Sequence, residues 1–183
     1  SDTIFALATP PGRSALAVFR ISGRDAGVVL ERLTGSALPP SRMASLRPLY
    51  DHVSGERVDQ AIVTYFRGPA SYTGEDLVEL SVHGGRGVIS AISSVLARIE
   101  GLRAAEPGEF TRRAYAAGKF DLSQAEAIAD LIDSETEFQR RQALRLLEGG
   151  LGQLAESWRQ RLIQFAAALE SMLDFSDEGD VDE

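Results

Sequence analysis

The sequence predicts an α+β amino-terminal domain with a mixed β-sheet, followed by an all-α helical segment. Short apolar stretches separated by turns that contain Gly or Pro fill the chain before Pro107. Beyond Lys119 the apolar residues recur at helical spacing instead. The charge changes at the same place. Residues 1–118 carry 13 basic and 12 acidic side chains, whereas residues 119–183 carry 6 and 15.

The composition is that of an ordinary globular protein, with 44% hydrophobic and 25% charged residues among 183. The absence of cysteine excludes disulfides and thiolate metal sites, and two histidines are too few for a histidine-rich metal site, so we expect no metal. No apolar run approaches the roughly 20 residues of a membrane span, and no signal peptide is evident. We therefore expect a cytoplasmic protein without a membrane partner.

Basic residues cluster at two places, Arg112-Arg113 and Arg140-Arg141. A nucleic-acid surface normally needs larger groups of Lys and Arg, because neutralising phosphates supplies most of the affinity. We expect this chain to bind RNA poorly by itself.

The first two strands are predicted over residues 3–9 and 15–21, joined by the turn Pro10-Pro11-Gly12. Alternation places Arg20 on the same face as Leu16 and Val18, and the remaining apolar residues on the other face. Arg20 is then either an edge-strand side chain that reaches solvent, or a binding residue whose planar guanidinium donates to a carboxylate or a polar heterocycle.

The rest of the first domain is predicted from turn residues and periodicity. We expect a helix over 24–33, strands over 47–53 and 59–66 with a turn at Ser54-Gly55, a loop over 68–74, a strand over 76–82 and a helix over 86–99. Glu79 lies in the middle of the 76–82 strand, opposite in direction to the core residues. It is either a solvated side chain or a carboxylate that accepts N–H groups from a ligand.

The two domains are predicted to join near Lys119, which is the only lysine in the sequence. A helix over 109–117 should end at Gly118 in a left-handed cap. Ser123 with Glu126, and Ser134 with Glu137, have the spacing of capping boxes and predict two helix starts. Lys119 is either a cation at a helix C-terminus or part of a binding site.

Beyond the joint we expect helices over 123–133 and to about residue 148, with a kink at Gly149-Gly150. A third helix carries an apolar seam at steps of three and four, which requires a helical partner. Its members are Leu151, Ala155, Trp158, Leu162, Phe165, Leu169 and Met172. The end of the chain, DFSDEGDVDE, holds six acidic residues and no basic ones, as expected of a solvated linker.

Long ordered motifs resemble those of the MnmE (TrmE) family of tRNA-modification GTPases. They are DTIFALATPPGRSALAVFRISG, GPASYTGEDLVELSVHGG, PGEFTRRAYAAGKFDLSQAEAIADLI and DFSDE. The resemblance implies an aminomethyltransferase-like folate-binding fold. It implies a folate-binding and dimerisation domain over 1–118, the first part of a helical domain over 119–175, and an acidic linker over 176–183 toward a GTPase domain that this sequence does not include.

The resemblance therefore implies that the binding sites for GTP, magnesium and potassium lie in parts of the parent protein that this sequence does not include. Gly118-Lys119 has the order of a P-loop end, but Arg113 stands where G-x-x-x-x-G-K-[ST] needs glycine and Phe120 where it needs Ser or Thr. We expect no GTP site in this chain and no catalytic residue.

The resemblance further implies a tetrahydrofolate cofactor, either the 5-formyl or the 5,10-methylene derivative, bound by Arg20, Glu79 and Lys119. One carboxylate can accept both the amino group and the ring N–H of a pterin, which suits Glu79. The cations suit the carboxylates of the folate tail, although either Arg20 or Lys119 could fill that role. The implied partners are a second copy of the chain, the flavoprotein MnmG (GidA), and tRNA through the full complex.

Two functions stay open at this stage. The chain either positions a one-carbon donor for wobble-uridine modification or is a non-catalytic dimerisation and docking module with vestigial folate binding. An autonomous folate-dependent transferase is disfavoured, because carboxylates are the sole general bases in evidence.

Overall fold

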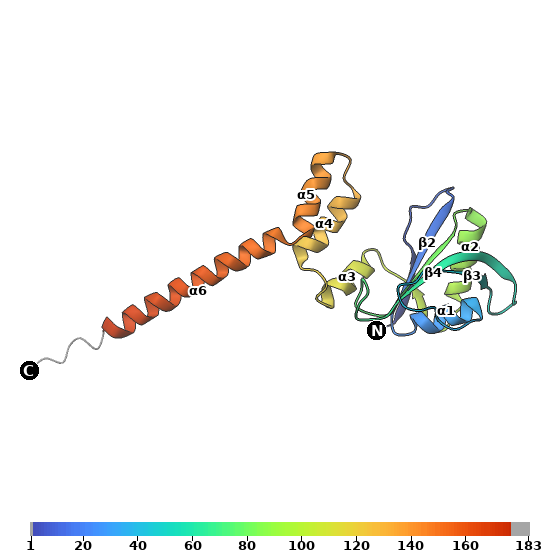
Figure 1. Ribbon diagram of the computed structural model, residues 1–183, viewed down its shortest axis with the longest axis horizontal. Coiled ribbons are helices and arrows are strands. Elements are labelled where there is room, and N and C mark those ends of the chain that lie inside the picture. The colour runs from blue at the N-terminus through green and yellow to red at the C-terminus, as the bar shows by residue number, and fades with distance from the viewer. Residues whose placement is uncertain (1, 177–183) are drawn as a thin grey trace, which may run out of the picture. The chain divides into compact units, whose positions relative to one another are not determined.

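The computed structural model describes residues 2–176, without the side chains of residues 151, 153 and 173–176. The chain divides into two compact units, one ending at Lys119 and the other beginning at Phe120 (Figure 1). Elements lie within three residues of the predicted bounds, apart from one short strand.

The first unit contains a six-stranded sheet in the order β3-β4-β5-β2-β1-β6. The strands are β1 (Thr3–Leu7), β2 (Leu16–Ser22), β3 (Ser45–Tyr50), β4 (Arg57–Phe66), β5 (Leu77–His83) and β6 (Leu102–Ala104). Neighbours are antiparallel except for β1 and β6, which are parallel. The predicted mixed sheet is confirmed. Strand β6 was not predicted, because three residues are too few to show an alternating pattern of apolar and polar side chains.

Helices α1 (Ala26–Thr34) and α2 (Arg86–Ala97) pack on one face of this sheet (Figure 1). The face consists of alternate strand residues, which confirms the predicted core face of β5 and the predicted alternation in β2. Ala17, Phe19, Ile21, Val78, Leu80 and Val82 are all buried there against Leu30, Leu33, Ile92 and Leu96 of the two helices. Burying a large apolar side chain contributes about 1.5–3 kcal/mol, so this layer stabilises the unit and fixes the strand register.

The opposite face of the sheet is only partly covered. Ile4, Ser22 and Leu77 are buried at one end of it, whereas Leu16 and Ile62 are exposed. Arg20 and Glu79 lie between these two regions, half-buried. The edge-strand interpretation of Arg20 is wrong, because β2 lies between β5 and β1.

Helix α3 (Glu109–Ala116) follows β6 and ends as the sequence predicted. Gly118 has φ 68°, a left-handed conformation that glycine adopts without a Cβ penalty. The backbone N–H of Lys119 then donates to the carbonyl oxygen of Ala114 at 2.9 Å. The position of Lys119 is therefore fixed by the end of α3.

The second unit contains α4 (Leu122–Ile132), α5 (Glu137–Leu147) and α6 (Gly150–Ser176). Both predicted capping boxes are wrong by two residues. Asp121 pairs with Gln124 and Thr136 pairs with Gln139 instead. The serine hydroxyls are engaged elsewhere: Ser123 donates to the Asp121 carboxylate at 2.7 Å, and Ser134 donates to the Leu131 carbonyl at 2.8 Å.

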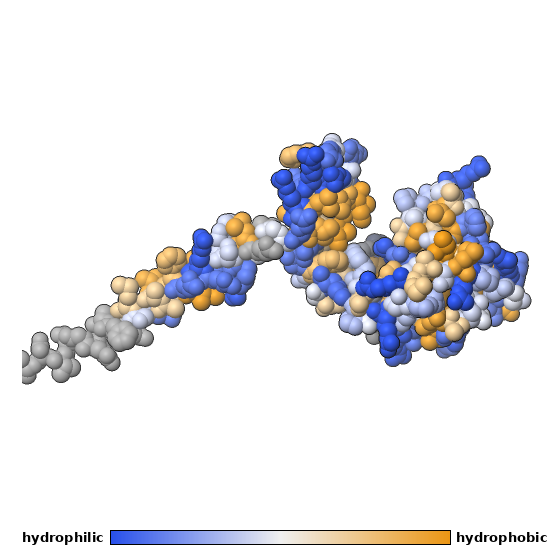
Figure 2. All heavy atoms as spheres, viewed as in Figure 1, coloured by the Kyte–Doolittle hydropathy of each residue, from blue (hydrophilic) through white to orange (hydrophobic). Residues whose placement is uncertain are grey.

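Helix α6 begins after Gly149, whose φ of 81° confirms the predicted break. Hydrophobic side chains lie at the surface along this helix (Figure 2). The exposed members of the predicted seam are Ala155, Trp158, Leu162, Phe165, Leu169 and Met172. Apart from Ser176, the linker expected over 176–183 lies outside the described residues. Within residues 2–176 no helix is both long and apolar enough to cross a membrane.

Candidate functional site at the Arg20–Glu79 pair

The two predicted ligand residues on the sheet contact each other. In the register of β2 and β5, Arg20 lies directly opposite Glu79. Arg20 Nε donates to Glu79 Oε1 at 2.8 Å, and the two side chains are 37% and 31% exposed. Both come from interior strands, so the backbone on which the pair stands is held by hydrogen bonds on either side.

This pairing leaves acceptor capacity on the carboxylate. Among the described residues, the bond from Arg20 is the one hydrogen bond that Glu79 accepts, and it uses Oε1. A carboxylate has about four lone-pair positions on its two oxygens. Glu79 is thus oriented by Arg20 and can still accept N–H groups from a ligand at Oε2.

Tyr72 of the 68–74 loop completes this part of the site. The Arg20 guanidinium carbon lies 5.6 Å from the centroid of the Tyr72 ring, within the range of a cation–π contact. The loop therefore reaches the Arg20–Glu79 pair through an aromatic side chain.

Several hydrogen bonds hold this loop in place. The Asp76 carboxylate accepts the Gly68 N–H at 2.8 Å and the Tyr65 hydroxyl at 2.7 Å. Burial and the neighbouring Asp76 carboxylate raise the pKa of Tyr65 to about 12, so its phenol keeps its proton at neutral pH. Thr73 is hydrogen-bonded to Ser22 of β2 at 2.7 Å, in a buried contact. The loop is thus anchored to the sheet at both ends.

Lys119 meets the same loop at another point. Its Nζ donates to the carbonyl oxygen of Pro69. The ammonium group is therefore directed to the loop and not to a carbonyl at the end of α3. The structure brings Arg20 and Glu79 into direct contact and connects Lys119 to them through the 68–74 loop.

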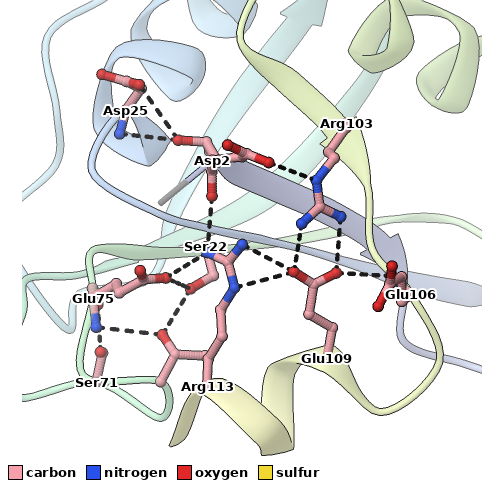
Figure 3. Close-up of polar contacts among 11 residues, drawn as sticks. Asp2, Ser22, Asp25, Ser71, Glu75, Arg103, Glu106, Glu109 and Arg113 are labelled. Atoms are coloured by element: carbon pink, nitrogen blue, oxygen red, sulfur yellow. Dashed lines mark hydrogen bonds and ion pairs between the residues drawn. The ribbon is translucent and has the colours of Figure 1, made fainter. Parts of the chain in front are cut away.

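Next to this loop lies a group of charged residues that the sequence did not reveal (Figure 3). At its centre is Glu109, whose side chain is 3% exposed. Arg103 donates to both its oxygens at 2.7 and 2.9 Å, and the Glu106 N–H donates to Oε2 at 2.8 Å. Hydrogen bonds from Arg103, with further ones from the Glu106 amide and Arg113, lower the pKa of Glu109 to about 2. Glu109 is therefore ionised at any physiological pH.

Arg113 extends this group to the loop. Its Nη2 donates to Glu109 at 3.0 Å, while its Nη1 donates to Glu75 at 2.8 Å and to the Asp2 carbonyl at 2.8 Å. Only the Arg112-Arg113 doublet was visible in the sequence. An acidic residue in the first turn of a helix is common, so no spacing singled out Glu109.

Among residues 2–176, no three His, Asp or Glu side chains are placed to hold a metal ion.

Comparison with known proteins connects this chain to a family. The family model described as GTP-binding protein TrmE N-terminus matches residues 3–119, and the one described as MnmE helical domain matches residues 122–183. The chain is 55% identical over 183 residues to the tRNA modification GTPase MnmE of Methylobacterium sp. (strain 4-46), covering 100% of this chain and 42% of that protein.

Two further relatives carry the same name. The protein from Phenylobacterium zucineum (strain HLK1) is 56% identical over 178 residues, covering 97% of this chain and 39% of that protein. The protein from Paramagnetospirillum magneticum (strain AMB-1) is 52% identical over 178 residues, covering 97% and 40%. The chain thus spans about two fifths of the length of these relatives.

Proposed function

Because this chain belongs to the MnmE (TrmE) family of tRNA-modification GTPases, we propose that it binds a reduced folate and forms a dimer within such an enzyme. The bound folate, a 5-formyl- or 5,10-methylene-tetrahydrofolate, carries the one-carbon unit for wobble-uridine modification in the cytoplasm. The flavoprotein MnmG and tRNA are the partners of the whole protein, and its GTP hydrolysis is carried out outside these residues.

The observation that carries the folate proposal is the oriented pair of Arg20 and Glu79. A partly exposed ion pair contributes only about 0–1 kcal/mol to stability, so stability alone is a weak reason to fix these charges on interior strands. A pterin presents an amino group and a ring N–H side by side, and a carboxylate held by an arginine is suited to accept both. Bound folate would supply the one-carbon unit, while these side chains would hold and orient its ring.

The contacts also favour one orientation of the ligand. Arg20 lies within hydrogen-bond distance of Glu79, so both belong to the same end of the site, which is the end that holds the ring. Lys119 lies against Pro69, elsewhere on the 68–74 loop. Its ammonium is then the candidate for the tail carboxylates, which need a cation but no planar fork.

The proposed dimer rests on the partly covered face of the sheet. Leu16, Leu46 and Ile62 are 61%, 63% and 49% exposed there. Leu46 and Ile62 lie on the neighbouring strands β3 and β4, and Leu16 lies on β2, on the other side of β5. Apolar side chains gathered on one exposed face are typical of an interaction surface. A second copy would bury them and would also cover unpaired strand edges.

The direct test is calorimetric titration of this chain with 5-formyltetrahydrofolate. We expect saturable binding with one ligand per chain and no binding of GTP at the same concentrations. Absence of folate binding by a chain that still dimerises would overturn the cofactor proposal and favour the docking-module alternative.

A further inference from the structure

We propose that Arg113 is a positioning residue for this site, coupling helix α3 to the loop that carries Tyr72, so that ligand affinity depends on a side chain that does not touch the ligand. The inference rests on the proposed folate site and adds to it the device that sets its geometry.

Helix α3 and the residues that follow it contact the loop at three points. The Thr111 hydroxyl is hydrogen-bonded to the Tyr72 hydroxyl at 3.0 Å. The Arg113 guanidinium meets the Glu75 carboxylate at 2.8 Å. The Lys119 ammonium meets the Pro69 carbonyl. The loop is thus held along its length by one helix and its cap, and a displacement of α3 would move both Tyr72 and Lys119.

Among these three contacts, the one at Arg113 is the one that joins opposite charges, and it is partly buried. The Arg113 side chain is 13% exposed, and its partners Glu75 and Glu109 are 26% and 3% exposed. Charge-assisted hydrogen bonds are about twice as strong as neutral ones, and desolvation increases the difference. The Tyr72 contact is a bond between neutral hydroxyls, and the Lys119 contact is an exposed bond from an ammonium to a neutral backbone carbonyl.

Glu109 holds the Arg113 guanidinium in a fixed position. It receives Arg103 from β6 on both oxygens and Arg113 from its own helix (Figure 3). Arg113 is therefore held to the sheet through Glu109 and to the loop through Glu75 at the same time. Glu75 in turn accepts the Ser22 hydroxyl at 3.2 Å, two residues along β2 from Arg20.

The chemistry requires arginine. Nε and Nη2 of the planar Arg113 guanidinium donate to Glu109, while Nη1 donates to Glu75 and to the Asp2 carbonyl. A lysine ammonium offers one nitrogen at the end of a flexible stem and cannot bridge two carboxylates with the same geometry. Arg113→Lys should therefore keep the charge and lose the coupling.

The neighbouring Arg112 provides a matched control. It lies on the same helix and pairs with Glu106 at 2.9 Å, but both side chains are more than 60% exposed. Arg112→Lys makes the same chemical change next to the position of interest. Glu75→Gln is a second, milder variant, because it weakens the contact to the loop and leaves the Arg113–Glu109 pair intact.

The experiment measures 5-formyltetrahydrofolate binding and the position of Lys119 in these variants. Lys119 is the only lysine, so labelling with 15N-lysine gives one backbone amide signal in the unmutated chain and in Glu75→Gln. Each Arg→Lys variant adds a second signal, and the signal of Lys119 is then the one that disappears when Lys119→Met is added. We expect Arg113→Lys and Glu75→Gln to shift that signal and to weaken binding about tenfold, within the range of coupling between neighbouring groups. Arg112→Lys should change neither.

The combination of Arg113→Lys with Lys119→Met separates positioning from stability. If Arg113 acts through Lys119, the double variant binds nearly as well as Lys119→Met alone. Losses that are additive both with Lys119→Met and with Tyr72→Leu, or an unshifted signal with unchanged affinity in Arg113→Lys and Glu75→Gln, would overturn the positioning role. An unmutated chain that does not bind 5-formyltetrahydrofolate would instead overturn the proposed function and this role with it.

Discussion

Arg20 and Glu79 face each other across β2 and β5, with Nε 2.8 Å from Oε1. The sequence suggested both residues as separate ligand contacts. Because they are paired, a substitution of either residue also affects the other, which is left on the sheet as a charge without its partner. Any reading of their separate contributions therefore needs the double variant as well.

We expect Glu79→Ala to weaken folate binding more than any other single change at the site. It would leave two pterin donors unpaired, which costs about 1–3 kcal/mol, or roughly a tenfold to hundredfold loss of affinity. Arg20→Ala should cost less, and the double variant should lose less than the sum of the two. Calorimetric titration measures all three. Glu31→Ala, at an exposed position of α1, is the control. A Glu79→Ala chain that binds normally would contradict the assigned role.

The fold was predictable where periodicity ran long enough. Alternation in β2 and β5 and helical spacing in α2 gave the correct elements, and alternation in β5 also gave the correct core face. The three residues of β6 carry too little pattern, and it pairs with β1 across about a hundred residues of sequence. The capping boxes failed because Asp121 and Thr136 offered equivalent side chains two residues from those predicted, at Ser123 and Ser134.

The sequence suggested residues for the candidate site but not how they are arranged. Alternation placed Arg20 and Glu79 on corresponding faces of their strands, yet pairing in register depends on the strand order of the sheet. The role of Glu109 could not be predicted, because its partners Arg103 and Arg113 come from different elements and its burial follows only from packing. Three-dimensional contacts of this kind leave no spacing in the sequence.

Lys119→Met should weaken folate binding mainly at low salt. The tail carboxylates of folate are solvent-accessible in the proposed orientation, and exposed charges are screened beyond about 10 Å at 0.1 M salt. The difference between Lys119→Met and the unmutated chain should therefore shrink when titrations are repeated at high salt. A difference that persists unchanged would place the ammonium against a buried part of the ligand instead.

The chain should dimerise through the partly covered face of the sheet. Light scattering at high micromolar concentration should give twice the mass of 19.8 kDa. Ile62→Asp should weaken the dimer at least tenfold, because it places a charge among apolar residues. Val28→Asp is the matched control, since Val28 is also 49% exposed but lies on α1. A monomeric unmutated chain, or equal effects of the two variants, would contradict this interface.

Helix α6 should be less stable than the first unit. Its exposed apolar side chains, among them Trp158, Leu162 and Phe165, each forgo about 1.5–3 kcal/mol of burial. Amide hydrogen exchange should therefore be fast beyond Gly150 and slow in β2 and β5. Equal protection of both regions would indicate that a second copy of the chain or another helix covers the seam.

Acid should remove the contribution of Glu109 to stability. Hydrogen bonds from Arg103 and other donors lower its pKa from the ordinary 4.5 to about 2 in the folded chain. Between these two pH values the unfolded chain binds the proton more readily, so the free energy of unfolding falls as pH falls, by up to about 1.4 kcal/mol per pH unit for this one group. The contribution is fully present above about pH 4.5.

Glu109→Gln isolates that contribution from those of other carboxylates. At pH 7 the variant should be less stable than the unmutated chain, because two arginines lose a buried carboxylate. The difference should shrink as pH falls from about 4.5 toward 2, because the glutamate becomes neutral in the folded chain below about pH 2. Urea unfolding at a series of pH values measures it. Glu106→Gln, whose side chain is 64% exposed, should differ little from the unmutated chain. A gap between Glu109→Gln and the unmutated chain that stays constant down to pH 3 would mean that Glu109 acts through its shape and hydrogen bonds, and not through its charge.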